Sequence, residues 1–355
     1  MMIINILRHL DRRKIQFDFV AHTDDRCDLF DDIESLGGRI HVMPRFNLFN
    51  IFSYTNAWKS FLKANSGGHD ILHSHIRSTA CLYLPIARKF GYTTIAHSHN
   101  TAVDRGIRGT LKYLLQWGLR RQNIDYYFAC SKKAGTWLFG KKIAENRLIL
   151  LKNAIDCKSF TFNQPTRAFK RQQLNLDGKF VIGHVGRFFP QKNHSFLIDV
   201  FAEVAARDTH ATLLLVGDGD LRPIIEEKVN ALGLAERVMF TGVRTDVAEM
   251  MQAMDVFLFP SLYEGLPVTL IEAQAAGLPC VTSDTITDEV AITDLVDPLS
   301  LHSPVGLWAE KVLSKRYNQR RDMSEAINQA GYDVDQTAAW LENFYLDAVS
   351  RRAID

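Results

Sequence analysis

The sequence predicts an α/β protein with two doubly wound, Rossmann-like domains and a cleft between them at the carboxyl ends of the strands. Short apolar runs alternate with amphipathic segments, and this alternation restarts near residue 178, so the two halves are similar in size. Hydrophobic residues make up 46% of the 355, which is enough for two full cores.

The first half contains helix-like segments between short apolar runs. Tyr54, Trp58, Phe61 and Leu62, for example, share one side of a predicted helix. Helices are predicted over 1–10, 26–36, 53–64, 111–123 and 131–139, and strands over 15–20, 39–43, 70–75, 92–99, 126–130 and 148–151.

The second half repeats the pattern after a polar region that ends at Asp177. Strands are predicted over 180–185, 211–216, 238–240, 255–259 and 280–283, and helices over 194–207, 222–232, 247–254, 268–276, 305–315, 322–331 and 334–352. We therefore expect an N-terminal domain over 1–165, joined by the C-terminal helix over 334–355, and a second domain over 166–333. The hinge is expected between Phe160 and Asp177.

Composition excludes several classes of protein. A net charge of +2 gives no case for nucleic-acid binding. The five scattered cysteines include no CxxC pair, which indicates a reducing compartment without disulfides or a thiolate metal site. No segment approaches the ~20 apolar residues of a membrane span, and no apolar leader is evident. We expect a cytoplasmic location.

The segment after the strand over 255–259 is the most informative. Glu264 and Glu272 bracket the start of a helix, and the N–H groups of Gly265 and Leu266 lie at its positive end, where anions bind. This order of carboxylate, anion cradle and carboxylate matches the hexose, diphosphate and ribose of a sugar nucleotide. An ordinary strand–loop–helix with two solvated glutamates is the alternative.

Basic residues follow the strand over 180–185. Gly186 permits a tight turn close to a ligand, while Arg187 and Lys192 bring two cations to the end of the strand. The alternative is a solvated basic loop. The position after a strand, at the same end of the sheet as Glu264, favours phosphate binding.

Two further strand exits carry glycines. Gly217 and Gly219 fail the GxGxxG fingerprint because residue 222 is arginine. This loop either lets backbone approach a nucleotide or simply turns the chain. Gly242 and Val243 follow the next strand, and their backbone could face the base or ribose.

The first half has two His-Ser-His triplets, at 73–75 and 97–99. Residues i and i+2 of a strand share a face, so each triplet could supply a pair of zinc ligands. No acidic or cysteine cluster accompanies them, and we predict no metal ligands. His73 and His97 fit hydrogen-bonded core histidines, whereas His99, just before the loop at Asn100-Thr101, is the predicted functional histidine.

Together these segments resemble the retaining GT-B glycosyltransferases of family four, in particular the branch that assembles bacterial polysaccharides. The resemblance covers nearly the whole chain. It rests on Gly186-Arg187 with Lys192, Gly217-Asp-Gly219, Thr241-Gly242, and Glu264 followed eight positions later by Glu272, and in the first half on Asp70–His75, Ala96–Asn100 and Ala129–Ser131.

The resemblance implies a role for each predicted site residue. Arg187 and Lys192 would hold the diphosphate of a UDP-linked sugar, Glu264 and His99 the hexose, and Glu272 the ribose. It also implies transfer with retention to a lipid-linked or polysaccharide acceptor, without a cofactor or metal ion. A UDP-sugar 2-epimerase and a non-enzymatic binding subunit are the rival readings.

Family members begin with a strand and a glycine-rich loop, whereas this sequence starts inside the helix that follows them. We expect either a mis-assigned start or a shortened enzyme, with exposed edges on the strands beside the gap.

Basic side chains of the first half could contact anionic lipid on the inner face of the plasma membrane, or could be scattered and solvated. They are Arg8, Arg12, Arg13, Lys14, Arg120, Arg121, Lys132, Lys133, Lys141 and Lys142.

Overall fold

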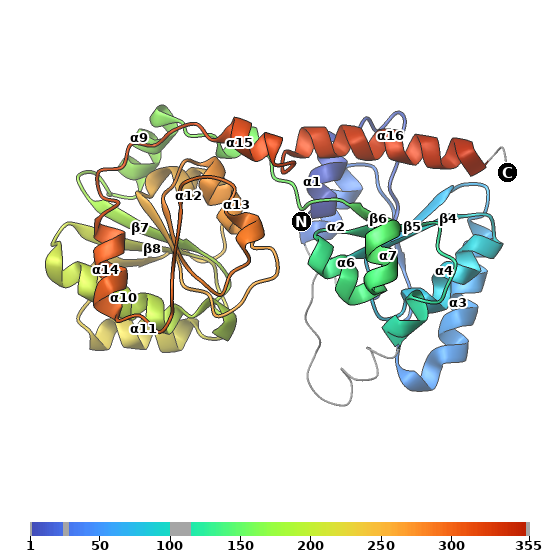
Figure 1. Cartoon of the computed structure of the whole chain (residues 1–355), viewed down its shortest axis with the longest axis horizontal. Helices are drawn as coiled ribbons and strands as arrows, with labels where there is room; N and C mark the ends of the chain where they lie inside the picture. The colour runs from blue at the N-terminus through green and yellow to red at the C-terminus, as the bar shows by residue number, and fades with distance from the viewer. Residues whose placement is uncertain (1, 24–27, 100–114, 353–355) are drawn as a thin grey trace. The chain divides into compact units, whose positions relative to one another are not determined.

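The computed structural model describes residues 2–23, 28–99 and 115–352, and it divides the chain into two units (Figure 1). Unit 1 comprises residues 1–154 with 334–355, and unit 2 comprises 155–333. The division falls between Ala154 and Ile155 rather than at 165, because the helices that follow Ile155 pack within unit 2.

Unit 2 contains one sheet of six parallel strands in the order β12-β11-β10-β7-β8-β9. This is the 3-2-1-4-5-6 order of a doubly wound fold, in which ligands bind where the strand order reverses, here between β7 and β10. The strands are β7 Phe180–Val185, β8 Ala211–Val216, β9 Val238–Phe240, β10 Val256–Phe259, β11 Cys280–Ser283 and β12 Val296–Leu299. β12 was not predicted.

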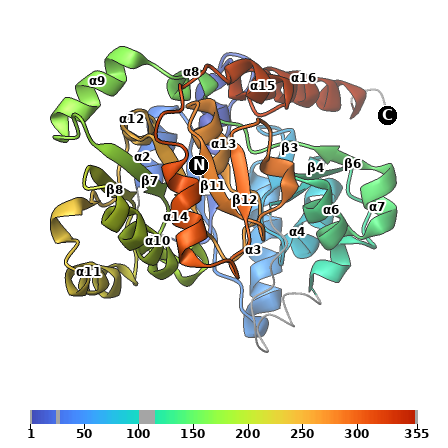
Figure 2. The ribbon, with the colours of Figure 1, turned by 60° about the vertical axis from the view of Figure 1, so that its left-hand side comes forward.

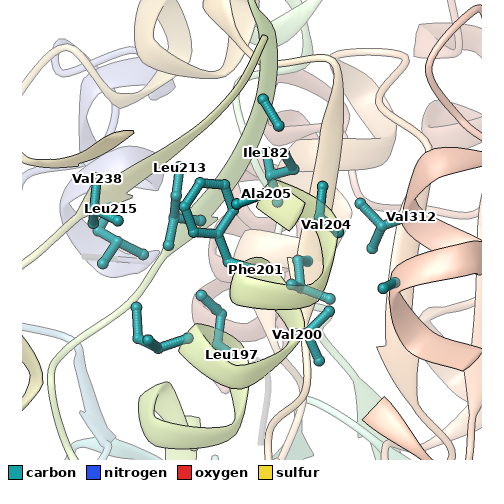
Figure 3. Close-up of a cluster of buried hydrophobic side chains, with 14 of the residues drawn as sticks. Ile182, Leu197, Val200, Phe201, Val204, Ala205, Leu213, Leu215, Val238 and Val312 are labelled. Carbon is teal, nitrogen blue, oxygen red and sulfur yellow. The ribbon is translucent and has the colours of Figure 1, made fainter. Parts of the chain in front are cut away.

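Helices cover both faces of this sheet. α10 and α14 lie side by side, and Phe201 of α10 is fully buried among Ile182, Leu213 and Val204 (Figures 2 and 3). The helices of unit 2 are α8 Cys157–Phe160, α9 Gln164–Gln173, α10 His194–Arg207, α11 Arg222–Ala231, α12 Val247–Ala253, α13 Val268–Ala275, α14 Val305–Leu313 and α15 Ser324–Gln329, with short 3₁₀ turns Pro190–Lys192, Ala235–Arg237 and Asp288–Val290.

The region over 160–177, where the sequence predicted the hinge, contains the end of α8 and all of α9. Asp255, beside β10, accepts hydrogen bonds from the guanidinium groups of Arg167 and Arg171 on α9 and from the Val181 N–H at 2.7 Å. Lys170 of α9 is 3% exposed. The inner face of α9 is therefore charged, so no apolar stripe revealed the helix.

Unit 1 contains two parallel sheets, β1-β2 and β3-β4-β5-β6. They adjoin where Asp18 Oδ2, just before β1, lies 2.9 Å from His69 Nε2, just before β3. β1 and β3 are edge strands, and among the described residues no strand lies between them. The strands are β1 Phe19–Ala21, β2 Ile40–Val42, β3 Ile71–Ser74, β4 Thr93–Ser98, β5 Tyr126–Ala129 and β6 Leu148–Leu150.

The helices of unit 1 include one that was not predicted, α4. Pro85 inside it removes the hydrogen bond to the Cys81 carbonyl, which instead accepts one from Gln122 Nε2 at 2.7 Å. The helices are α1 Met2–His9, α2 Asp28–Ser35, α3 Ile51–Ala64, α4 Ala80–Lys89, α6 Lys132–Phe139, α7 Lys141–Asn146 and α16 Val334–Arg352, with a 3₁₀ turn Leu48–Asn50. Residues 115–119 are also helical, whereas 26–27, 100–101 and 111–114 of the predicted segments lie outside the described residues.

The C-terminal helix α16 returns to unit 1 and lies against α1 (Figure 1). Glu342 of α16 accepts hydrogen bonds from Lys14 Nζ at 2.6 Å and from the Asp11 N–H at 3.2 Å. Within the described part of the chain, every helix is too short or too polar to cross a bilayer.

Replacing Asp255 by alanine should destabilise unit 2 by about 3–5 kcal/mol, because it leaves Arg167 and Arg171 without their carboxylate in a mostly buried position. Calorimetry or urea unfolding measures the change. The matched control is Asp294→Ala, which removes a solvent-exposed pair with Arg321 and should change stability within experimental scatter. Equal effects of the two substitutions would contradict the structural role of Asp255.

Candidate functional site

The exits of β7 and β10 meet at the point where the strand order of unit 2 reverses. Asn193 Nδ2, after β7, donates to the Pro260 carbonyl at 3.2 Å, and the Leu262 N–H donates to the Gln191 carbonyl at 2.8 Å. These bonds hold the two loops against each other. The sequence-predicted residues Lys192 and Glu264 lie on these loops, one on each.

Lys192 and Glu264 form an ion pair, with Nζ 2.8 Å from Oε1. Gln191 Nε2 donates to the other carboxylate oxygen at 2.8 Å. The Lys192 and Glu264 side chains are only 16% and 7% exposed. Lys192 Nζ also lies 4.5 Å from the centroid of the Phe259 ring. The structure thus fixes a cation at the strand ends, where the sequence predicted phosphate binding.

Arg187, unlike Lys192, has an exposed side chain. Its side chain is 68% exposed, and its guanidinium lies 3.9 Å from Asp220 Oδ1, an equally exposed carboxylate. So long and exposed a pair contributes little to stability. Arg187 can therefore turn toward an anion without breaking a strong contact.

Gly186, Gly217 and Gly219 allow the exits of β7 and β8 to pack backbone against backbone. A Cβ on Gly217, whose φ is +134°, would lie 2.2 Å from the Gly186 carbonyl oxygen. A Cβ on Gly219, with φ +155°, would lie 2.6 Å from the Phe188 carbonyl oxygen. The sequence left open whether this loop approaches a ligand or turns the chain, and close packing within the protein already requires both glycines.

Two further predicted donor-binding residues, Gly242 and Val243, lie just after β9. The Gly242 carbonyl accepts from the Gly217 N–H at 2.9 Å, and Val243 is 80% exposed. A groove of about 620 Å³ lies where the loop after β8 leads into α11. Its lining is Asp218, Gly219, Asp220, Arg222, Pro223 and Glu226, so Gly219 is the predicted residue that it includes.

Helix α13 begins at Val268, as the sequence predicted. Pro267 is its N-cap residue and Val268 its first residue, so Gly265 and Leu266 lie in the preceding bend and not in the first turn. The helix ends as predicted, at Gly277 with φ +67° and a Leu278 N–H bond to the Ala273 carbonyl.

Glu272 lies within α13, and its side chain is partly buried. Burial, which penalises the charged form, raises the pKa of this carboxyl to about 7 from its ordinary value of 4.5. Near neutral pH the group therefore changes between a carboxylic acid, which donates a hydrogen bond, and a carboxylate, which accepts one.

His99 belongs to unit 1, where it is one of four neighbouring imidazoles. Its Nε2 lies 2.7 Å from His75 Nδ1, and its ring stacks on His97 with centroids 4.1 Å apart. Burial lowers the pKa of His99 to about 4, so the ring is neutral at pH 7. His97 is 1% exposed, in keeping with its reading as a core histidine.

Sequence reasoning missed His184 and His194 beneath the Gly186 turn. The two rings lie 4.9 Å apart, and His194 stacks on Phe188 at 4.1 Å. Burial lowers the pKa of both imidazoles, so they support the turn as neutral rings. The position of His184, two residues before Gly186 on a wholly buried strand, was the only available signal.

Several of the basic side chains of unit 1 that could face a membrane have partners within the protein. Arg8 pairs with Asp32 at 3.0 Å, Lys14 with Glu342 at 2.6 Å, and Arg13 with Asp11 at 2.9 Å. Arg120 donates to the carbonyls of residues 137 and 138. The three ion pairs offset part of the positive charge of this surface, whereas Arg120 keeps its charge but is held against the backbone.

Comparison with known proteins follows the division into units. Residues 1–159 match the family model described as Glycosyltransferase Family 4, and residues 179–311 match the model described as Glycosyl transferases group 1. The putative glycosyltransferase EpsF of Bacillus subtilis (strain 168) is 36% identical over 353 residues, covering 97% of this chain and 92% of EpsF.

Two further proteins that resemble this chain are a galactosyltransferase and a protein whose structure was solved with UDP. UDP-Gal:alpha-D-GlcNAc-diphosphoundecaprenol alpha-1,3-galactosyltransferase of Escherichia coli is 27% identical over 224 residues, covering 61% of this chain and 58% of that enzyme. Anabaena Alr3699/HepE, whose crystal structure is in complex with UDP, has a TM-score of 0.78 at 18% identity, covering 98% of this chain and 95% of that one. The HepE likeness shows a common fold.

The raised pKa of Glu272 predicts a pH dependence of stability. Between pH 4.5 and about 7 the folded protein retains a proton that the unfolded chain has released, so this group makes unfolding easier as pH rises through that window. The shift corresponds to up to about 3 kcal/mol. Glu272→Gln, which cannot ionise, should therefore gain stability relative to the wild type between pH 4 and pH 8 in calorimetric scans.

The matched control is Glu289→Gln, because Glu289 is exposed. Its stability relative to the wild type should stay constant over the same range. A constant difference for Glu272→Gln as well would show that the carboxyl is not desolvated.

Proposed function

The chain belongs to the family 4, group 1 glycosyltransferases, and from that premise we propose that it moves a hexosyl residue from a UDP-sugar to a lipid-linked or polysaccharide acceptor with retention of configuration and without a metal ion. The observation that carries the proposal is the mostly buried Lys192–Glu264 pair where the strand order reverses. In a doubly wound fold this is the position at which a nucleotide ligand binds.

Each predicted site residue has a proposed role. Lys192 and Arg187 neutralise the diphosphate, and Glu264, which still has free lone pairs, accepts a hexose hydroxyl. Glu272 accepts the ribose hydroxyls, and His99 contacts the hexose near the reacting carbon. The backbone of Gly186, Gly217, Gly219, Gly242, Val243, Gly265 and Leu266 borders the donor.

The proposed reaction balances without a further reactant. The bond between the anomeric carbon and the β-phosphate oxygen breaks, and its electron pair leaves with UDP. An acceptor hydroxyl oxygen bonds to the same face of that carbon, and its proton passes to the departing phosphate oxygen. Lys192 and Arg187 stabilise the charge that develops on the leaving group, which is the role that a metal ion takes in other phosphate chemistry.

We infer the donor and the acceptor from proteins that this chain resembles. HepE was crystallised with UDP, which favours a uridine nucleotide, and the E. coli enzyme is named for a diphosphoundecaprenol acceptor, which favours a lipid-linked one. A lipid-linked acceptor would bring the protein to a membrane surface. Arg12, Arg121, Lys132, Lys133 and Lys142, all exposed basic residues of unit 1, would then contact anionic lipid.

Incubation of the purified protein with a panel of UDP-sugars and a diphosphate-lipid acceptor tests the proposal. We expect acceptor-dependent release of UDP, an α-linked product from an α-linked donor by NMR, and the same rate with or without added Mg²⁺ or Mn²⁺. A β-linked product would overturn retention. Epimerised UDP-sugar without acceptor, or tight binding of UDP without turnover, would support the rival functions instead.

Lys192→Ala should lower the rate of transfer by about 100-fold or more, because the leaving diphosphate loses its fixed cation. Glu264→Gln tests the sugar contact separately, since it keeps the shape of the side chain. The control is Lys179→Ala, which removes an exposed lysine of the same unit and should leave turnover unchanged. Wild-type turnover in both site variants would refute the assignment of the site.

A further inference from the structure

The two His-Ser-His triplets of unit 1 come together across adjacent parallel strands. β3 and β4 pair with His73 opposite Ile95, and the histidines of each strand project from one face. His73 Nε2 lies 3.1 Å from His97 Nδ1, and His75 Nδ1 lies 2.7 Å from His99 Nε2. These two pairs stack on each other. The ring centroids of His73 and His75 lie 4.4 Å apart, and those of His97 and His99 lie 4.1 Å apart.

Three of these imidazoles converge on one point. One ring nitrogen from each of His73, His75 and His97 lies within 4.8 Å of the other two. His97 is 1% exposed, and its Nε2 is buried without a hydrogen-bond partner in the described structure. A buried ring nitrogen without a partner is unfavourable, and a bound ligand would remove that cost.

We propose that His73, His75 and His97 bind one divalent transition-metal ion of the zinc type. Imidazole nitrogen suits Zn²⁺, Co²⁺, Ni²⁺ and Cu²⁺, whereas Mg²⁺ and Ca²⁺ prefer oxygen ligands, which this group lacks. Two nitrogens on a tetrahedral zinc ion stand about 3.4 Å apart. His73 Nε2 and His97 Nδ1, 3.1 Å apart, already stand near that separation, whereas a metal ion on the partnerless His97 Nε2 requires the His97 ring to turn.

A neighbouring tyrosine holds one imidazole of the cluster in an orientation that suits metal binding. Tyr345 of α16 is 6% exposed, and its hydroxyl lies 2.6 Å from His73 Nδ1, which leaves the other ring nitrogen for the metal. The metal would join β3 to β4 and, through Tyr345, to α16.

Chelator-treated full-length protein is titrated with Zn²⁺ in equilibrium dialysis and with Co²⁺ by visible absorption. We expect one ion per chain with micromolar or tighter affinity, intense absorption bands of four-coordinate Co²⁺, and a higher Tm with Zn²⁺. His97→Gln should weaken binding at least 100-fold. Failure to bind Zn²⁺ at a tenfold excess over a 10 µM protein sample (roughly the range in which such sites fill) would overturn the proposal.

His210→Gln is the control, because His210 is an exposed histidine of unit 2, and it should bind metal like the wild type. Unchanged binding by His97→Gln would also overturn the proposal. Should His97→Gln fail to fold, Tyr345→Phe keeps all three ligands and should weaken binding about 10–100-fold; wild-type affinity in that variant would count against the role of Tyr345. The readout is metal binding and not transfer, so its failure is distinct from failure of the proposed function.

Discussion

The ion pair between Lys192 and Glu264 is the contact that holds the two loops of the candidate site in unit 2 together. It joins the exits of β7 and β10 where the strand order reverses, and both side chains are mostly buried. Losing either partner would leave an uncompensated charge in a poorly solvated position. Because Glu264 already offsets the charge of Lys192, an anion bound there needs further positive charge. Exposed Arg187, with only a weak partner, is suited to supply it.

That arrangement constrains the neighbouring backbone. The exit of β8 reaches the exit of β7 so closely that side chains at Gly217 or Gly219 would overlap carbonyl oxygens. The glycines therefore bring a third loop to the same edge of the sheet, whether or not a ligand also touches them. Glycines at strand exits are therefore evidence for close backbone packing. A role in ligand binding requires a separate observation, such as the position of Lys192.

The sequence predicted helices and strands best where buried apolar residues recur with a simple period. The bounds of β7, α10, β8 and α16 agree with the prediction because their apolar patterns are continuous. The sequence failed where another interaction replaces apolar burial. α9 buries Lys170 and Arg171 against carboxylates and carbonyls, which no hydropathy pattern reveals. α4 contains Pro85 and β12 contains Pro298, which is tolerated at the edge of the sheet.

At the candidate site, the sequence predicted individual residues but not which of them the fold brings together. Sequence placed Lys192 and Glu264 after separate strands, and the reversal of strand order brought them together. The sequence analysis considered each His-Ser-His triplet separately as a pair of metal ligands. The register of β3 and β4 brings the two triplets side by side. Unit 1 is discontinuous in sequence and closed by α16. A metal ion on His73, whose other nitrogen contacts Tyr345, would therefore stabilise the junction between the N-terminal and C-terminal parts of that unit.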